Sequence, residues 1–124
     1  MFTLKIRENF EAAHRLPGYP GKCNRLHGHN WQVEVEIVGE KLDKLGMLVD
    51  FVVVKQTLKN ILDEFDHLYL NELPPFDGGL NPTAENLAKL IFSRLEASDI
   101  FPPNVELSAV TVWESEHSCV TYAP

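Results

Sequence analysis

Two long runs of alternating apolar and polar residues constrain this chain most, because a side-chain period of two is typical of a β-strand. In the second run, apolar residues occupy every other position from Trp31 to Ile37, and the same parity reaches back to His29 and His27. Successive side chains of a strand point to opposite faces, so these two imidazoles lie on one face, with α-carbons about 6.6 Å apart. Two imidazoles at that spacing can bind one metal ion.

The first run, from Phe2 to His14, ends in a third histidine of matching parity. If the two runs pair as antiparallel neighbours, three imidazoles meet on a shared face and leave one coordination position open, as in catalytic zinc sites. A single histidine at a strand end is more often a hydrogen-bonded polar residue, so the prediction depends on all three together. Neutral imidazole also suits copper, iron and nickel. Zinc is the first choice, because the second run carries no carboxylate or second cysteine at ligand spacing.

Length and composition limit the chain to one domain, residues 1–124, and exclude several classes of protein. The 124 residues are 44% apolar and 23% charged, as in ordinary soluble domains. A net charge of -7 argues against binding to a nucleic-acid backbone. The first residues are charged where a signal peptide is apolar, and no apolar stretch is long enough to span a membrane. Two cysteines are too few for a disulfide scaffold, so we expect free thiols and a cytoplasmic location.

Two helices and two further strands follow in the sequence. A 3.6-residue apolar period predicts a helix from an Asp50 cap to about Phe65, and Thr83 caps a second helix that ends near Ala97. Residues 105–113 and 119–122 favour strands. The ββααββ order predicts an α+β fold, a four-stranded antiparallel sheet with two helices packed on one face. Such a sheet has two unpaired edges, so we expect edge-to-edge oligomerisation.

A second set of reactive residues lies outside the strands. Cys23 lies near the end of a loop rich in proline and glycine, residues 16–24, four positions before His27. A thiol becomes a base or nucleophile only as the thiolate, which a neighbouring imidazolium or metal favours. Asp66 directly precedes His67 and can orient its ring. The residues alone leave two simpler interpretations open: a small loop cysteine, and a helix-end histidine that interacts with the helix dipole.

Six motifs, in order along the chain, resemble the 6-pyruvoyltetrahydropterin synthase family. They are FEAAHRL at 10–16, CNRLHGH at 23–29, LVDF at 48–51, DHLYLN at 66–71, NPTAE at 81–85 and VWE at 112–114. The resemblance covers essentially the whole chain. The short spacing between Cys23 and His27 is similar to the queuosine-pathway branch, whose product is 6-carboxy-5,6,7,8-tetrahydropterin, because the pyruvoyl branch has a longer gap.

The resemblance implies the tunnelling fold (T-fold), in which trimers close a barrel and pair as homohexamers with active sites at subunit interfaces. The site residues that it implies are His14, His27 and His29 for Zn²⁺, Cys23, Asp66 and His67 for catalysis, and Glu114 and Thr83 for the substrate. Glu114 would accept hydrogen bonds from the pterin ring, although a strand carboxylate is more often on the surface. A role as a helix cap would also account for Thr83.

The implied activity is that of a carbon–carbon lyase, which converts 7,8-dihydroneopterin triphosphate to the carboxypterin, acetaldehyde and triphosphate. The metal would acidify side-chain hydroxyls, Cys23 would move carbon-bound protons, and His67, held by Asp66, would move hydroxyl protons. Alternatives stay open: the pyruvoyl product or another side-chain cleavage on the same fold, a non-catalytic zinc- or pterin-binding module, and a zinc hydrolase. Candidate cations for the triphosphate are Arg15, Lys22 and Arg25, and no role is assigned to His117 or Cys119.

Overall fold

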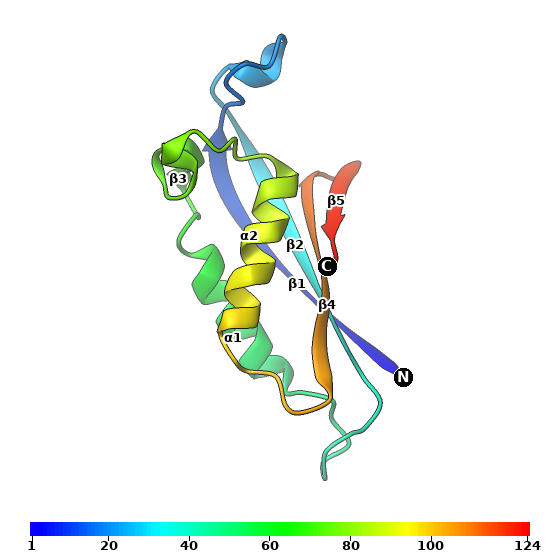
Figure 1. Ribbon diagram of the computed structural model, residues 1–124. Helices are drawn as coiled ribbons and strands as arrows, with labels where there is room; N and C mark the ends of the chain where they lie inside the picture. The colour runs from blue at the N-terminus through cyan, green and yellow to red at the C-terminus, as the bar shows by residue number, and fades with distance from the viewer.

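The two alternating runs form the longest strands of the protein, and these strands are antiparallel neighbours. The computed structural model describes residues 1–124 and contains β1 (Phe2–His14) beside β2 (His27–Gly39) (Figure 1). Their register places His14 opposite His27, and Ala12 opposite His29. The predicted pairing is confirmed, and all three histidines fall on one face of the sheet.

The sheet has five strands, so the prediction of a four-stranded, wholly antiparallel sheet in the order ββααββ is wrong in detail. β4 (Val105–Ser115) and β5 (Ser118–Tyr122) match the expected final strands, but β3 (Leu68–Tyr69) lies between the helices in sequence and runs parallel to β1. The spatial order is β3-β1-β2-β4-β5. A strand of only two residues, such as β3, is too short to show an alternation of apolar and polar side chains. β3 depends on long-range docking against the end of β1, which a local pattern cannot indicate.

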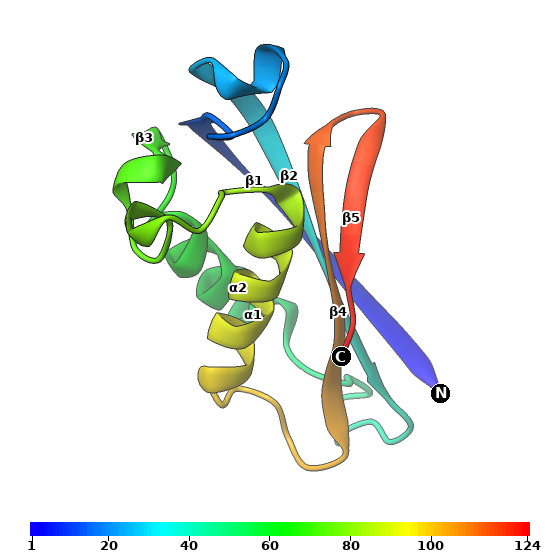
Figure 2. The same cartoon turned by 45° about the horizontal axis from the view of Figure 1, so that its top comes forward.

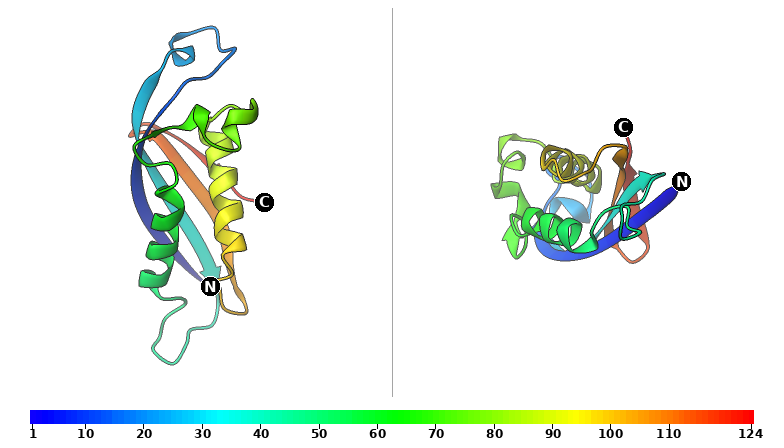
Figure 3. Two further views of the ribbon diagram at one scale, coloured as in Figure 1. Left: turned by 90° about the vertical axis from the view of Figure 1, so that its left-hand side faces the viewer. Right: turned by 90° about the horizontal axis from the view of Figure 1, so that it is seen from below.

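Both helices begin at the predicted caps and cover the same face of the sheet (Figures 2 and 3). The side chain of Asp50 caps α1 (Phe51–Leu62), and that of Thr83 caps α2 (Ala84–Ala97), each by accepting a hydrogen bond from a backbone N–H of the first turn. These bonds satisfy donors that a helix start leaves free. Neither helix has the length and apolar composition needed to cross a membrane.

The two faces of the sheet differ as the alternation predicts. Under the helices, Trp31 and every second residue of β2 up to Ile37 are fully buried. The opposite face carries ion pairs, in which Lys5 and Arg7 of β1 lie within 4 Å of Glu34 on β2. We call these the inner and outer faces. The three histidines therefore lie on the inner face, just beyond the apolar core.

Both edges of the sheet are largely open. β3 pairs only with Ala12 and Ala13, and the turn before it bonds to the backbone of Glu11, so the edge of β1 before Glu11 has unpaired backbone groups. β5 forms the other edge. Open edges favour pairing with another chain, and the expected oligomer stays a prediction.

Candidate active site

Three imidazoles and one carboxylate meet at one end of the inner face. His14 comes from β1, His27 and His29 from β2, and Glu114 from β4. One ligand atom from each of the four lies within 4.8 Å of the others. The ring centroids of the histidines are 4.5 to 5.0 Å apart. The structure thus brings together the three histidines that strand parity places on one face, while their role as metal ligands stays a prediction.

Hydrogen bonds to backbone carbonyls orient two of these rings. Nδ1 of His14 lies 2.8 Å from the carbonyl oxygen of Pro82, and Nδ1 of His27 lies 2.6 Å from that of Arg25. A carbonyl oxygen only accepts, so each Nδ1 carries the proton and donates. In the neutral ring the lone pair is then on Nε2. Metal-binding histidines are commonly held in this way through their second nitrogen.

The chemistry of the cluster fits a bound cation. Nε2 of His14 and of His29 is buried without a hydrogen bond. Oε1 of Glu114 lies 3.6 Å from the first and 2.8 Å from the second. Because the ring proton of His14 is on Nδ1, its Nε2 presents a lone pair to this carboxylate, whereas Nε2 of His29 lies within hydrogen-bond distance of it. Lone pairs that face a carboxylate are unfavourable unless a cation lies between them. Three imidazole nitrogens are donors that suit zinc and related ions.

The two rings with unpartnered nitrogens are also held in the neutral form. Burial lowers the pKa of His14 and of His29. The hydrogen bond to Pro82 opposes this effect on the pKa of His14, and the carboxylate of Glu114 opposes it for His29, but burial is the largest cause in both. Neutral imidazole is the form that binds metals. These rings therefore need not lose a proton at neutral pH before they bind a cation.

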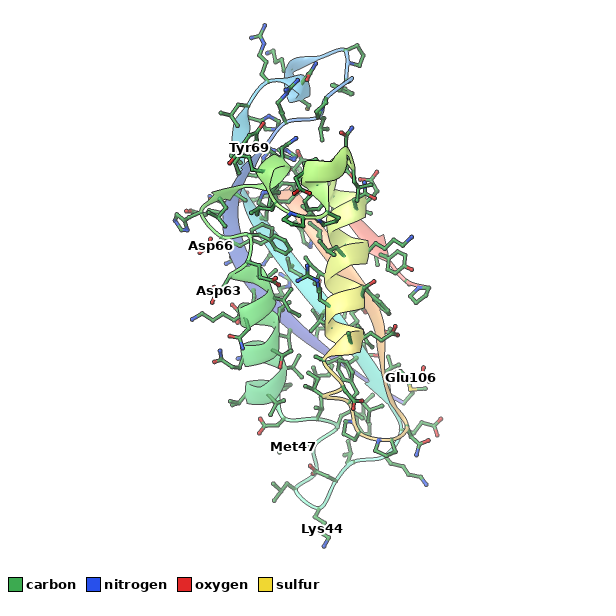
Figure 4. All side chains as sticks on the ribbon, turned by 60° about the vertical axis from the view of Figure 1, so that its left-hand side comes forward. Lys44, Met47, Asp63, Asp66, Tyr69 and Glu106 are labelled. Carbon is green, nitrogen blue, oxygen red and sulfur yellow. The ribbon has the colours of Figure 1, made fainter.

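The predicted acid–base pair lies elsewhere, at the edge of the sheet where β3 meets β1 (Figure 4). Oδ2 of Asp66 is 3.0 Å from Nδ1 of His67, and Oδ1 accepts a 2.9 Å hydrogen bond from the backbone N–H of Glu11. The N–H of Glu11, followed by the ring of His67, lowers the pKa of Asp66. In return, the carboxylate of Asp66 raises the pKa of His67. The ring is thus oriented by a carboxylate that stays ionised.

Cys23 belongs to neither cluster within one chain. It is a half-buried free thiol on the 3-10 turn Lys22–Asn24, in the loop that extends beyond the ends of β1 and β2 (Figure 2). The guanidinium of Arg15 donates to the backbone and side-chain oxygens of Asn24 and so ties down this loop. No group of ligand atoms within 4.8 Å of one another includes Cys23. A single chain therefore does not bring the thiol against both Asp66 and His67.

Two residues that the sequence analysis does not single out support these clusters. Pro82 orients His14 through its carbonyl, and Glu11 holds Asp66 through its N–H. Both act through backbone groups: every residue type offers a carbonyl, and every type except proline offers an N–H. Their positions in the family motifs are the only sequence signal that could have found them.

Thr83 acts as a helix cap, which is the simpler of its two predicted roles. Its Oγ1 accepts a 3.1 Å hydrogen bond from the N–H of Asn86. We expect Thr83→Ala to lower the free energy of unfolding by about 1 kcal/mol, as loss of a capping hydroxyl typically does. Urea denaturation measures this value, and Thr83→Ser, which keeps the hydroxyl, is the matched control. An alanine variant as stable as the parent would contradict the capping role.

Comparison with known proteins finds relatives along the whole chain. A family model described as 6-pyruvoyl tetrahydropterin synthase matches residues 3–124. The 6-carboxy-5,6,7,8-tetrahydropterin synthase of Synechocystis sp. is 38% identical over 105 residues, which cover 81% of this chain and 79% of the relative. The enzyme of that name from Haemophilus influenzae is 32% identical over an alignment of 143 residues, which covers 98% of this chain and 99% of the relative. Among solved structures, 6-pyruvoyl tetrahydropterin synthase of Caenorhabditis elegans gives a TM-score of 0.88 at 30% identity, covering 99% of this chain and 95% of that one.

Proposed function

Because this chain belongs to the 6-pyruvoyl tetrahydropterin synthase family, we propose that it converts 7,8-dihydroneopterin triphosphate to 6-carboxy-5,6,7,8-tetrahydropterin. In this reaction a carbon–carbon bond of the side chain is cleaved, and acetaldehyde and triphosphate are released. The relatives from Synechocystis sp. and Haemophilus influenzae, which bear the name of this activity, support it. The observation that carries the proposal is the cluster of three imidazoles in a chain with such relatives.

We propose that His14, His27 and His29 hold a divalent metal ion, with zinc as the first choice. The unpartnered Nε2 atoms of His14 and His29, and the carbonyl bond that turns His27, support this role. A bound divalent ion supplies a Lewis acid that polarises the oxygens of the substrate's side chain. The protein's part is to hold the three nitrogens in place, which the paired ends of β1 and β2 do.

Glu114 is the proposed anchor for the pterin ring. A carboxylate accepts two parallel hydrogen bonds well from adjacent N–H groups, such as the amino and ring N–H of a pterin. Its oxygen lies 2.8 Å from the ring of His29, so a pterin bound there would have its side chain beside the imidazoles. This proximity supports a substrate position in which recognition and chemistry share one pocket.

Proton transfer is assigned to three residues. His67, oriented by Asp66, exchanges protons with the side-chain hydroxyls of the substrate, and Cys23 as thiolate removes and returns carbon-bound protons. Neither cluster of one chain contains the complete set. We therefore propose that a second subunit completes each active site, through trimers that close a barrel and pair as hexamers. The open edges at β1 and β5 support this assembly, and we propose that residues 1–124 form its single repeating domain.

A second candidate is the 6-pyruvoyl activity, which the likeness to the Caenorhabditis elegans structure supports. The two candidate activities differ in the number of side-chain carbons that the product keeps. The carboxy product has lost two side-chain carbons as acetaldehyde, whereas the pyruvoyl product keeps all three. Identification of the product therefore distinguishes them where the fold does not.

We expect purified protein to convert 7,8-dihydroneopterin triphosphate to equal amounts of the carboxypterin and acetaldehyde, because the cleaved bond yields one of each. Mass spectrometry identifies the pterin, and trapping with a hydrazine measures the aldehyde. Protein stripped by a chelator is the control, and we expect it to regain turnover when Zn²⁺ is restored. A pyruvoyl product would favour the second candidate. No product from the metal-loaded protein would contradict both.

A further inference from the structure

Glu11 makes three separate contacts with the turn that carries Asp66 and His67. Its backbone N–H donates to Oδ1 of Asp66 at 2.9 Å, and its carbonyl accepts from the backbone N–H of His67 at 2.5 Å. Its own carboxylate oxygen Oε2 lies 3.2 Å from Nε2 of His67. From these contacts we infer that the Glu11 side chain is a positioning residue for His67, an inference that rests on the proposed acid–base role of that ring.

The contacts divide into two kinds. The two backbone bonds dock the turn on β1, and they hold His67 in a left-handed backbone conformation (φ 59°) that is uncommon outside glycine. The carboxylate of Glu11 instead reaches the imidazole itself. The ring therefore lies between two carboxylates, with Asp66 at Nδ1 and Glu11 at Nε2. A change to the side chain of Glu11 leaves both backbone bonds in place, so the two contributions can be tested separately.

The carboxylate of Glu11 holds the nitrogen that the substrate needs. Because Asp66 binds Nδ1, only Nε2 of His67 is free to exchange a proton with a substrate hydroxyl. Glu11 holds this nitrogen from the other side in the free protein, where the side chain of His67 is 72% exposed and is otherwise held only by Asp66 at Nδ1. A bound hydroxyl then replaces Glu11 at the same atom without reorientation of the ring. Holding a reacting group in its productive orientation is a recognised source of rate enhancement.

The two carboxylates beside the ring also affect the pKa of His67. Asp66 is the largest cause of the raised pKa of His67, and the negative charge of Glu11 adds to it. His67 lines two cavities of about 620 and 600 Å³, the first of which extends across β2 to β4. The other titratable groups that line them are Glu116, His29 and Tyr69. Among all of these, only Asp66 and Glu11 form an ion pair with the ring.

An ordinary surface ion pair would behave differently. Glu11 and His67 have side chains that are 58% and 72% exposed, and exposed pairs contribute little to stability. A merely structural contact therefore predicts a small change in melting temperature and no change in the chemistry. A positioning role predicts normal melting with a loss in kcat.

The test compares Glu11→Gln, which keeps the size and hydrogen-bonding capacity of the side chain but not its charge, with the metal-loaded parent. We expect kcat to fall about tenfold, with KM and melting temperature nearly unchanged. Loss of the negative charge disfavours the imidazolium form of His67, so the acidic limb of the plot of kcat against pH moves to lower pH. Glu11→Asp retains the charge and should return the limb to its original position. Glu96→Gln, the same charge change on the exposed side of α2, is the matched control.

Each outcome supports or overturns the inference. A Glu11→Gln enzyme with the parent's kcat and acidic limb would overturn it. Equal losses in the Gln and Asp variants, accompanied by lower melting temperatures, would assign Glu11 a structural role and also overturn it. If the parent itself turns over no pterin, the proposed function fails instead. NMR titration of the His67 ring then decides the inference: a lower midpoint in Glu11→Gln supports it, and an unchanged midpoint overturns it.

Discussion

Replacement of His27 by alanine is expected to leave the protein folded but without metal and almost without turnover. His27 supplies one of the three imidazoles in the cluster, and its side chain is only half-buried, so its loss leaves no cavity in the apolar core. Removal of a group that merely supports a ligand costs about 10- to 100-fold in metal affinity or activity, and we expect removal of the ligand itself to cost about 100-fold or more. Elemental analysis of the purified variant gives the metal content per chain.

The chain offers a matched control for this experiment. His117 lies in the exposed turn between β4 and β5, outside the cluster, and its replacement by alanine should change neither metal content nor turnover. Circular dichroism of both variants checks the fold. A His27→Ala protein that retains a full complement of metal would show that the ion binds elsewhere and would remove the basis of the proposed site.

The pairing of the two histidine-bearing strands could be predicted because the signal is long and redundant. Thirteen residues in each strand alternate in register, and a shift by one residue would move the buried apolar side chains of β2 from Trp31 to Ile37 to the outer face. The helix starts at Asp50 and Thr83 could also be predicted, because a capping side chain binds the backbone only two or three residues away. Local rules thus account for most of the fold.

The features that the sequence does not reveal depend on contacts between distant segments. β3 is a strand only because residues 68 and 69 dock beside Ala12 and Ala13, more than fifty positions earlier. Glu11 is one of several polar residues on the outer side of β1, and nothing in the alternation distinguishes it from Lys5 or Arg7. The conformation of the turn after α1 decides that Glu11 is the residue that reaches His67.

Parity along β1 also explains why the histidine cluster and the Asp66–His67 pair lie apart in one chain. His14 is on the inner face with the other two histidines, whereas Glu11, three positions earlier, is on the outer side and contacts the acid–base pair. An odd spacing on a strand always separates two side chains in this way. The histidine cluster and the Asp66–His67 pair therefore lie on different sides of β1. We expect His67 of one subunit to serve the metal cluster of another.

Replacement of Cys23 by alanine is expected to reduce turnover by about 10²- to 10⁴-fold, the usual contribution of a positioned acid or base. Metal content and fold should not change, because Cys23 lies on a short turn outside the four-residue cluster and is only half-buried. The loop around it is held by backbone oxygens, including its own carbonyl, which accepts from the N–H of Leu16 at 2.8 Å. An alanine keeps that bond, so the loss reports on the thiol alone. Rates with 7,8-dihydroneopterin triphosphate measure the effect.

Cys119 provides the control that distinguishes the position of the Cys23 thiol from the mere presence of a thiol. It is the other free cysteine, exposed on the edge strand β5, and Cys119→Ala should keep the parent's rate. Alkylation of the parent should inactivate it, whereas alkylation of a Cys23→Ala protein should change nothing further. If Cys23→Ala is as active as the parent, the thiol is not the group that moves carbon-bound protons. The assignment would then shift to His67, the other base in the proposed mechanism, which Asp66 keeps oriented.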